Sequence, residues 1–140
     1  MKKDKLQVNW KTKSIEDLEN DYWEQTSFPT NLVQRCNELR KIPLNQFLTE
    51  DLRIMIGQEI GLDYLIPLAI ETLNKDLFAE GDFYPGDLLQ NILNIEFTFW
   101  ENHKDYWAQI DNLLKDRQSE IKISNISVDK FYAFTTKGGG

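Results

Sequence analysis

The chain of 140 residues has one cysteine, one histidine and no long apolar run. A single cysteine, Cys36, cannot form an internal disulfide, which suits a reducing compartment. No stretch approaches the roughly 20 apolar residues that a membrane-spanning helix needs. No apolar stretch follows the first lysines, so we expect no secretory signal. The sequence therefore predicts a cytoplasmic protein that does not insert into a membrane.

Side chains that carry catalysis or bind metals are equally scarce. His103 lies at an exposed-looking helix start, and we expect it to be solvated rather than catalytic. Cys36 shares an apolar face with Leu32 and Leu39, so we expect a buried small hydrophobic side chain rather than a nucleophile. No Cys, His and carboxylate cluster has metal-ligand spacing. The sequence predicts no catalytic residue, no metal site and no cofactor.

Acidic residues are abundant, and their distribution is uneven. The formal net charge is −7, and residues 50–87 alone carry nine acids against Arg53 and Lys75. Residues 14–30 carry five acids and no base, whereas residues 1–13 carry five lysines and one aspartate. Such a surface repels nucleic-acid phosphates and anionic membranes, and it attracts a cationic protein. We expect a basic protein partner, with no nucleic acid and no membrane; the alternative is that the acids only maintain solubility.

Capping residues mark three helix starts in the first half of the chain. Ser14 is expected to cap a short helix, and Thr30 is expected to open a longer one that ends near Lys41. Thr49 is expected to cap a third helix, whose first turn carries two acids that suit the helix dipole. These signals predict short, separately capped helices up to about residue 57.

The second half of the chain continues the helical pattern. Apolar spacing predicts a helix over residues 63–74, with Pro67 near the end of its first turn if Asp63 is the cap. Turn-forming residues over 76–86 predict a loop. Two further helices are expected over residues 87–95 and 102–115. The elements together predict an all-α single domain of five or six helices.

The two ends of the chain differ from the helical part. Residues 1–13 form a basic N-terminal segment, residues 14–120 hold the predicted helices, and residues 121–140 form a C-terminal extension of uncertain structure. Apolar residues in the extension alternate only loosely. A short strand pair, an extra helix and an interaction tail all stay open for it.

Four tryptophans divide by their surroundings. Trp100 and Trp107 lie in apolar sequence and are expected in the core. Trp10 and Trp23 lie in polar sequence and are expected to be partly exposed. None is interleaved with a basic patch, which argues against a platform for single-stranded nucleic acid.

Three stretches occur together in a characteristic order and spacing. They are LVQRCNELRKIPL over residues 32–44, EDLRIMIGQEIGLDYLIPL over residues 50–68, and EGDFYPGDLL over residues 80–89. Their combination resembles the bacterial immunity proteins of contact-dependent growth inhibition (CDI) and related polymorphic toxin systems. The resemblance extends over roughly residues 14–114, and the residues after 120 fall outside it.

The resemblance implies a small helical cytosolic protein that binds the toxic C-terminal domain delivered by a neighbouring bacterium. Such toxin domains are frequently nucleases, and many are basic. The implied function is stoichiometric occlusion of the cognate toxin, and the chain itself is not expected to be an enzyme. The resemblance implies fold-determining roles (caps, turns and a buried arginine pair) at Arg53, Gly57, Gly61, Pro67, Gly81, Pro85, Gly86 and Asp87.

Charge density alone selects the candidate toxin-binding residues. We expect an acidic helical face, anchored by an aromatic side chain, to contact the toxin. Its predicted contact residues are Glu59, Asp63, Glu71, Asp76, Glu80 and Asp82.

Two other functions stay open. A carboxylate- or metal-dependent hydrolase would use the loop Glu80–Asp87, with Asp82 and Asp87 among its acids. A bound divalent ion would favour this hypothesis, and a capping role for Asp87 would disfavour it. An acidic adaptor would instead bind another basic protein by the same face.

Overall fold

The structure is a computed structural model that describes residues 9–23 and 30–137, with side chains described as far as residue 134. Most of the predicted basic segment, residues 1–8, lies outside the described residues, as do Glu24 and the three terminal glycines. Within the described part the chain forms nine α-helices, two 3-10 turns and one isolated β-bridge. The α-helices are α1 (Ile15–Glu19), α2 (Asn31–Leu39), α3 (Thr49–Gly57), α4 (Leu62–Lys75), α5 (Asp87–Leu93), α6 (Phe97–Asn102), α7 (Lys104–Leu114), α8 (Gln118–Ile123) and α9 (Asp129–Lys137).

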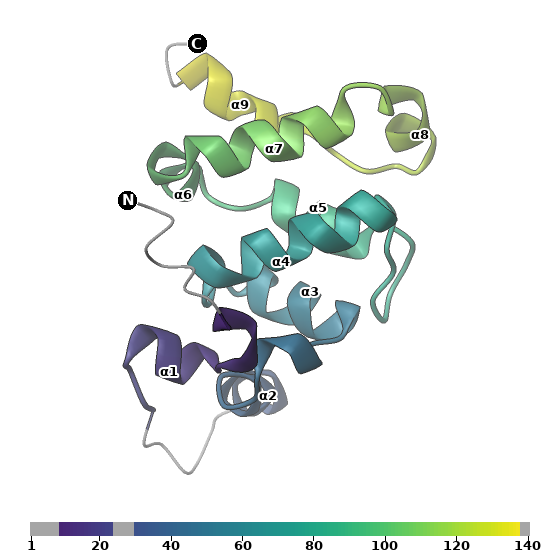
Figure 1. The fold of residues 1–140 in the computed structure, drawn as a ribbon. Helices are drawn as coiled ribbons and strands as arrows, with labels where there is room; N and C mark the ends of the chain where they lie inside the picture. The colour runs from purple at the N-terminus through teal and green to yellow at the C-terminus, as the bar shows by residue number, and fades with distance from the viewer. Residues whose placement is uncertain (1–8, 24–29, 138–140) are drawn as a thin grey trace.

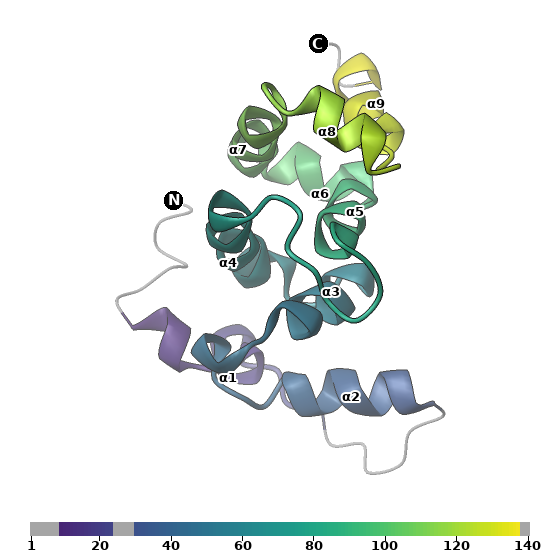
Figure 2. The same cartoon turned by 90° about the vertical axis from the view of Figure 1, so that its right-hand side faces the viewer.

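The helices are stacked in three tiers (Figure 1). α1 and α2 form one end, α3, α4 and α5 form the middle tier, and α6 to α9 form the other end; Figure 2 shows the same order from the side. α3 packs against α2, α4 and α5, while α7 packs against α4 and α6. The all-α prediction is confirmed. None of the described helices is long and apolar enough to cross a membrane.

The predicted cap at Ser14 is confirmed, and Thr30, expected to open the next helix, is the cap of that helix. Ser14 Oγ accepts a hydrogen bond from Asp17 N at 3.2 Å, at the start of α1. Thr30 Oγ1 accepts one from Val33 N at 3.1 Å, at the start of α2. Each hydroxyl satisfies a backbone N–H that the first turn of a helix leaves without a partner.

The predicted cap of α3 is wrong by one residue. Thr49 is the first residue of the helix, and Leu48 occupies the capping position. The side chain of Asp51 performs the capping, because its Oδ2 accepts a hydrogen bond from Leu48 N at 2.9 Å. This is the half of a capping box in which the carboxylate at the third helical position accepts a hydrogen bond from the backbone N–H of the cap residue.

Helix α4 begins one residue earlier than expected, directly after Gly61, whose φ of 67° lies in the left-handed region that glycine tolerates. Pro67 therefore lies in the second turn of the helix and not in the first. Because proline lacks an N–H, the carbonyl of Asp63 loses its usual helical donor. The hydroxyl of Tyr106, on α7, lies 3.4 Å from this carbonyl and donates to it instead. The proline thus creates an acceptor that ties α4 to α7.

Three of the nine helices, α6, α8 and α9, lie outside the predicted set. α6 and α8 have six residues each and no side-chain cap. Helices this short are marginal by local propensity and depend on tertiary packing. Among the alternatives for the C-terminal extension, the structure shows helix.

The aromatic core explains why these short helices form. Trp100 is fully buried, and its ring meets that of Phe131 edge-on at a centroid distance of 5.5 Å. The ring of Trp107 stacks on that of Phe131, with a centroid distance of 4.8 Å. Trp100 is buried and Trp107 half-buried against the core, while Trp10 and Trp23 are half-buried, as expected. α9 is therefore anchored on the same core as α6 and α7.

Candidate functional site

The predicted contact residues at the N-terminal end of α4 are engaged within the protein. Asp63 Oδ1 lies 2.9 Å from His103 Nε2, and Glu59 Oε2 accepts a hydrogen bond from Glu96 N at 3.2 Å. His103 is buried, and its ring stacks on Phe99 at a centroid distance of 4.3 Å. The prediction that His103 is solvated is wrong, because its aromatic neighbours and Asp63 hold it inside the fold.

Glu71, on α4, is paired with a lysine of the basic segment. Lys11 Nζ lies 2.8 and 2.7 Å from the two carboxylate oxygens of Glu71. Both side chains are exposed, so the pair stabilises the fold by at most about 1 kcal/mol. It nevertheless places a positive charge against this carboxylate.

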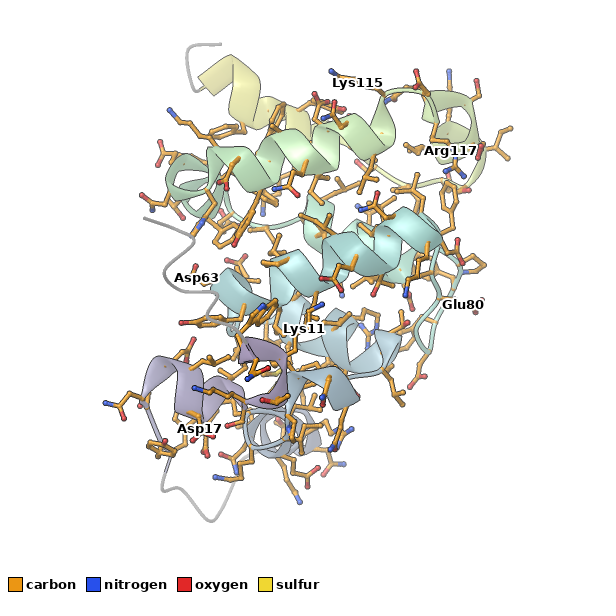
Figure 3. All side chains as sticks on the ribbon, viewed as in Figure 1. Lys11, Asp17, Asp63, Glu80, Lys115 and Arg117 are labelled. Carbon is orange, nitrogen blue, oxygen red and sulfur yellow. The ribbon has the colours of Figure 1, made fainter. Side chains whose placement is uncertain are left out.

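The other three predicted contact residues, Asp76, Glu80 and Asp82, lie in the segment between α4 and α5. All three are exposed. Asp76 Oδ1 accepts a hydrogen bond from Phe78 N at 3.1 Å. The carboxylates of Glu80 and Asp82 have no hydrogen bond or ion pair with other described residues. Figure 3 shows Glu80 and Asp63 on opposite sides of the molecule, so the six predicted residues are spread from the N-terminal end of α4 to the segment beyond its C-terminal end.

A buried carboxylate determines the shape of the loop between α4 and α5. Asp87, the first residue of α5, is 3% exposed. Its Oδ1 accepts a hydrogen bond from Gly81 N at 2.6 Å, and its Oδ2 accepts from Phe83 N at 3.0 Å and from Tyr84 N at 3.4 Å. Three backbone N–H groups of the loop therefore converge on one side chain.

This capping role disfavours the hydrolase hypothesis. The hydrolase would need the Asp87 carboxylate to face a substrate or a metal ion, but the backbone of the loop surrounds it. Among the described residues, no group of three or more His, Cys, Asp or Glu side chains is arranged to hold a metal ion. The geometry makes Asp87 a structural residue, as the resemblance implied.

Glu50 and Arg53, on α3, hold the loop from the neighbouring helix. Arg53 Nε donates to Glu50 Oε1 at 2.6 Å, and the same oxygen accepts from Asp82 N at 2.8 Å. The guanidinium of Arg53 lies over the ring of Phe83, 4.4 Å from its centroid. A Cβ at Gly81 would clash with the Glu50 carboxylate, so a larger residue there would have to displace this carboxylate from its hydrogen bonds. Arg53 and Glu50 form the largely buried arginine pair of the expected fold determinants.

Sequence reasoning selected the acids of this loop and missed the aromatic residues beside them. Phe83 is 67% exposed and Tyr84 is 44% exposed. The signal was present in the sequence EGDFYPG, where two aromatics lie between turn-forming glycines and acids. Spacing alone does not show that their rings face solvent, since most phenylalanines are buried.

Acidic pH is expected to weaken the attachment of the loop to α3. The Arg53 hydrogen bond lowers the pKa of the Glu50 carboxyl; the Asp82 N–H adds to this effect, and burial opposes it. Glu50 thus stabilises the fold fully above its unfolded pKa of about 4.3, and this stabilisation is lost as pH falls through the lower folded pKa. We expect the difference in unfolding free energy between wild type and Glu50→Gln, measured by urea denaturation, to shrink as pH falls below about 4.

The control for this prediction is Glu101→Gln, which removes an exposed carboxylate on α6. The difference in unfolding free energy between Glu101→Gln and wild type should stay small and nearly independent of pH. Parallel pH profiles for wild type and Glu50→Gln would show that Glu50 does not stabilise the fold through its charge.

Comparison with known families identifies one match. The family model described as CDI immunity proteins matches residues 17–110, about two thirds of the chain. The matched range runs from α1 into α7, and it includes α3, α4 and the loop held by Asp87. α8 and α9 lie beyond it, although their side chains complete the core. No curated protein and no solved structure matches the chain.

Proposed function

This chain belongs to the family of CDI immunity proteins, whose members neutralise a cognate toxin, and we propose that its target is a basic nuclease domain. In this proposal the chain binds the toxin's C-terminal domain in the cytosol as a stoichiometric inhibitor. It acts by occluding the active site or an essential surface, and it does not turn over a substrate. The family match over residues 17–110 is the observation that carries the proposal.

Charge supports a basic target. The chain carries a formal net charge of −7, and the exposed carboxylates of Glu80 and Asp82 form no ion pair with the described residues. A nuclease binds a polyanion, so its substrate site is rich in Lys and Arg. An acidic protein surface attracts the same cations, and it speeds encounter with the toxin. Occlusion of a nuclease therefore requires no catalytic group in the inhibitor.

The predicted contact residues contribute unequally in this proposal. Glu80 and Asp82 supply unpaired charge, with Asp76 nearby on the same segment. Asp63 and Glu71 are already paired with His103 and Lys11. A toxin contact at either of them would have to compete with the chain's own partner. We therefore place the toxin-facing surface at the C-terminal end of α4.

Co-expression provides the direct test. The chain should restore growth to cells that express the toxin domain encoded by the adjacent open reading frame, and the two purified proteins should form a 1:1 complex. Because opposite charges contribute to binding, the affinity should fall by about tenfold or more between low and high ionic strength, as measured by calorimetric titration. Salt-independent affinity would refute the electrostatic contribution and leave the inhibitor role intact. Absence of both rescue and complex would refute the proposed function.

A further inference from the structure

We infer that residues 80–84 (EGDFY), here called the anchor loop, are the docking element for the toxin domain, with Phe83 as the side chain that enters it. This inference rests on the proposed function, because the occupant to which it commits is a cationic toxin domain. It goes beyond that function in assigning the contact to one loop and one aromatic ring. The loop lies between α4 and α5, beside α3, in both views of the fold (Figures 1 and 2).

The exposure of the anchor loop is the first argument. Phe83 and Tyr84 are adjacent, and both rings are exposed, whereas Trp100 and Phe131 are fully buried. Removing the apolar area of an aromatic ring from water is favourable, so a partner that covers an exposed ring gains binding free energy. Aromatic residues in such positions are frequent anchors of protein interfaces.

The rigidity of the anchor loop is the second argument. Asp87 accepts hydrogen bonds from three of its N–H groups, and Glu50 accepts one from Asp82 N. The Phe83 ring rests on the Arg53 guanidinium, whose charge is already matched by Glu50. An anchor whose backbone and ring are held in place before binding loses little conformational entropy when the partner arrives. The loop is thus arranged to present the ring in one orientation.

The charge of the anchor loop indicates which kind of partner binds it. Glu80 and Asp82 precede Phe83 in the anchor loop, and neither has an ion-pair partner among the described residues. The complementary surface is an apolar slot with Lys or Arg side chains at its rim, as a basic nuclease domain presents beside its substrate site. A second copy of this chain would bring the same acids against each other, so like charges oppose self-association through this loop.

The exposed Ile123 on α8 offers a contrast within the same molecule. It is 85% exposed, so it displays apolar surface as Phe83 does. It lies beside Lys122 and outside the family match, and its neighbouring charge has the wrong sign for a cationic partner. Ile123→Ala therefore removes exposed apolar surface without touching the anchor loop, and it serves as the matched control.

The test compares variants of the full chain for binding to the purified toxin domain of the adjacent open reading frame, inactivated by a substitution in its own active site. Phe83→Ala should weaken affinity by roughly 30-fold or more, mainly through faster dissociation. The double variant Glu80→Gln/Asp82→Asn should slow association by about tenfold at low salt and by little at high salt. Ile123→Ala and Glu101→Gln should stay within about twofold of wild type, since they lie away from the loop.

Each outcome separates the inference from the proposed function. Because Phe83 is exposed, we expect Phe83→Ala to fold as the wild type does. An unchanged thermal unfolding midpoint would verify this. Wild-type affinity in Phe83→Ala together with continued growth rescue would overturn the docking inference and leave the proposed function standing. A wild-type chain that does not bind the toxin domain would overturn both. Loss of self-association in Phe83→Ala, with toxin affinity intact, would make the anchor loop a contact between two copies and also overturn the inference.

Discussion

Replacing Trp100 by alanine is expected to lower the free energy of unfolding by about 3–5 kcal/mol, the range seen when a fully buried aromatic residue is truncated. Trp100 is 0% exposed and the largest of the fully buried side chains. Its ring makes edge-on contacts with Phe99 at 5.2 Å and with Phe131 at 5.5 Å. Alanine would leave a cavity at the junction of α6 and α9, where these short helices have little other support.

Trp100→Phe provides the matched control for this prediction. The indole Nε1 is buried without a hydrogen-bond partner among the described residues, so replacing it removes an unsatisfied donor as well as some volume. Trp100→Phe should therefore lower the free energy of unfolding by much less than Trp100→Ala does. Urea denaturation followed by circular dichroism measures both variants. A loss below about 1 kcal/mol for Trp100→Ala would show that α6 and α9 do not share the cooperative core.

Asp87→Ala is expected to lower the free energy of unfolding by about 3 kcal/mol and to release the anchor loop. The reason is that the variant loses a buried carboxylate that accepts several backbone N–H bonds. Without it, the N–H groups of Gly81, Phe83 and Tyr84 lose their common acceptor. Hydrogen exchange at these three amides should accelerate markedly. Affinity for the toxin domain should fall by about tenfold or more, since the loop must then be ordered on binding.

Asp87→Asn distinguishes the structural role from the hydrolase hypothesis. The amide keeps one acceptor oxygen but turns an N–H₂ group toward backbone donors, so this variant should lose stability, though less than Asp87→Ala. The hydrolase hypothesis requires instead that activity is lost while folding is preserved. Unchanged stability and unchanged amide exchange in both variants would contradict the assignment of Asp87 as the residue that holds the loop.

Helix class and several boundaries could be predicted because their causes lie close together in the chain. Ser14 and Thr30 cap their helices by bonds to residues three positions away. The loop before Asp87 was also predictable, because glycine and proline restrict or permit local backbone conformations whatever surrounds them. Thr49 was misassigned, since the capping position lies one residue earlier, at Leu48, and the Asp51 carboxylate accepts a hydrogen bond from the backbone N–H of Leu48.

The short helices could not be predicted from local signals. α8 and α9 follow a segment whose apolar spacing fits several structures, and only contacts with distant residues distinguish among them. Phe131 reaches Trp100 and Trp107 across more than twenty residues of chain. Likewise, the burial of His103 depends on Asp63, which belongs to a different helix.

For the candidate site, the sequence by itself determined the amount of negative charge and the acidic stretch in which most of it lies. Only the tertiary structure decided which carboxylates already have partners within the protein. Lys11 pairs with Glu71, and Asp87 is buried, only once the whole chain has folded. The tertiary structure also decided that Phe83 is exposed. Charge is a property of single residues and can be counted along the chain, whereas exposure and pairing depend on which distant segments the shared core brings together.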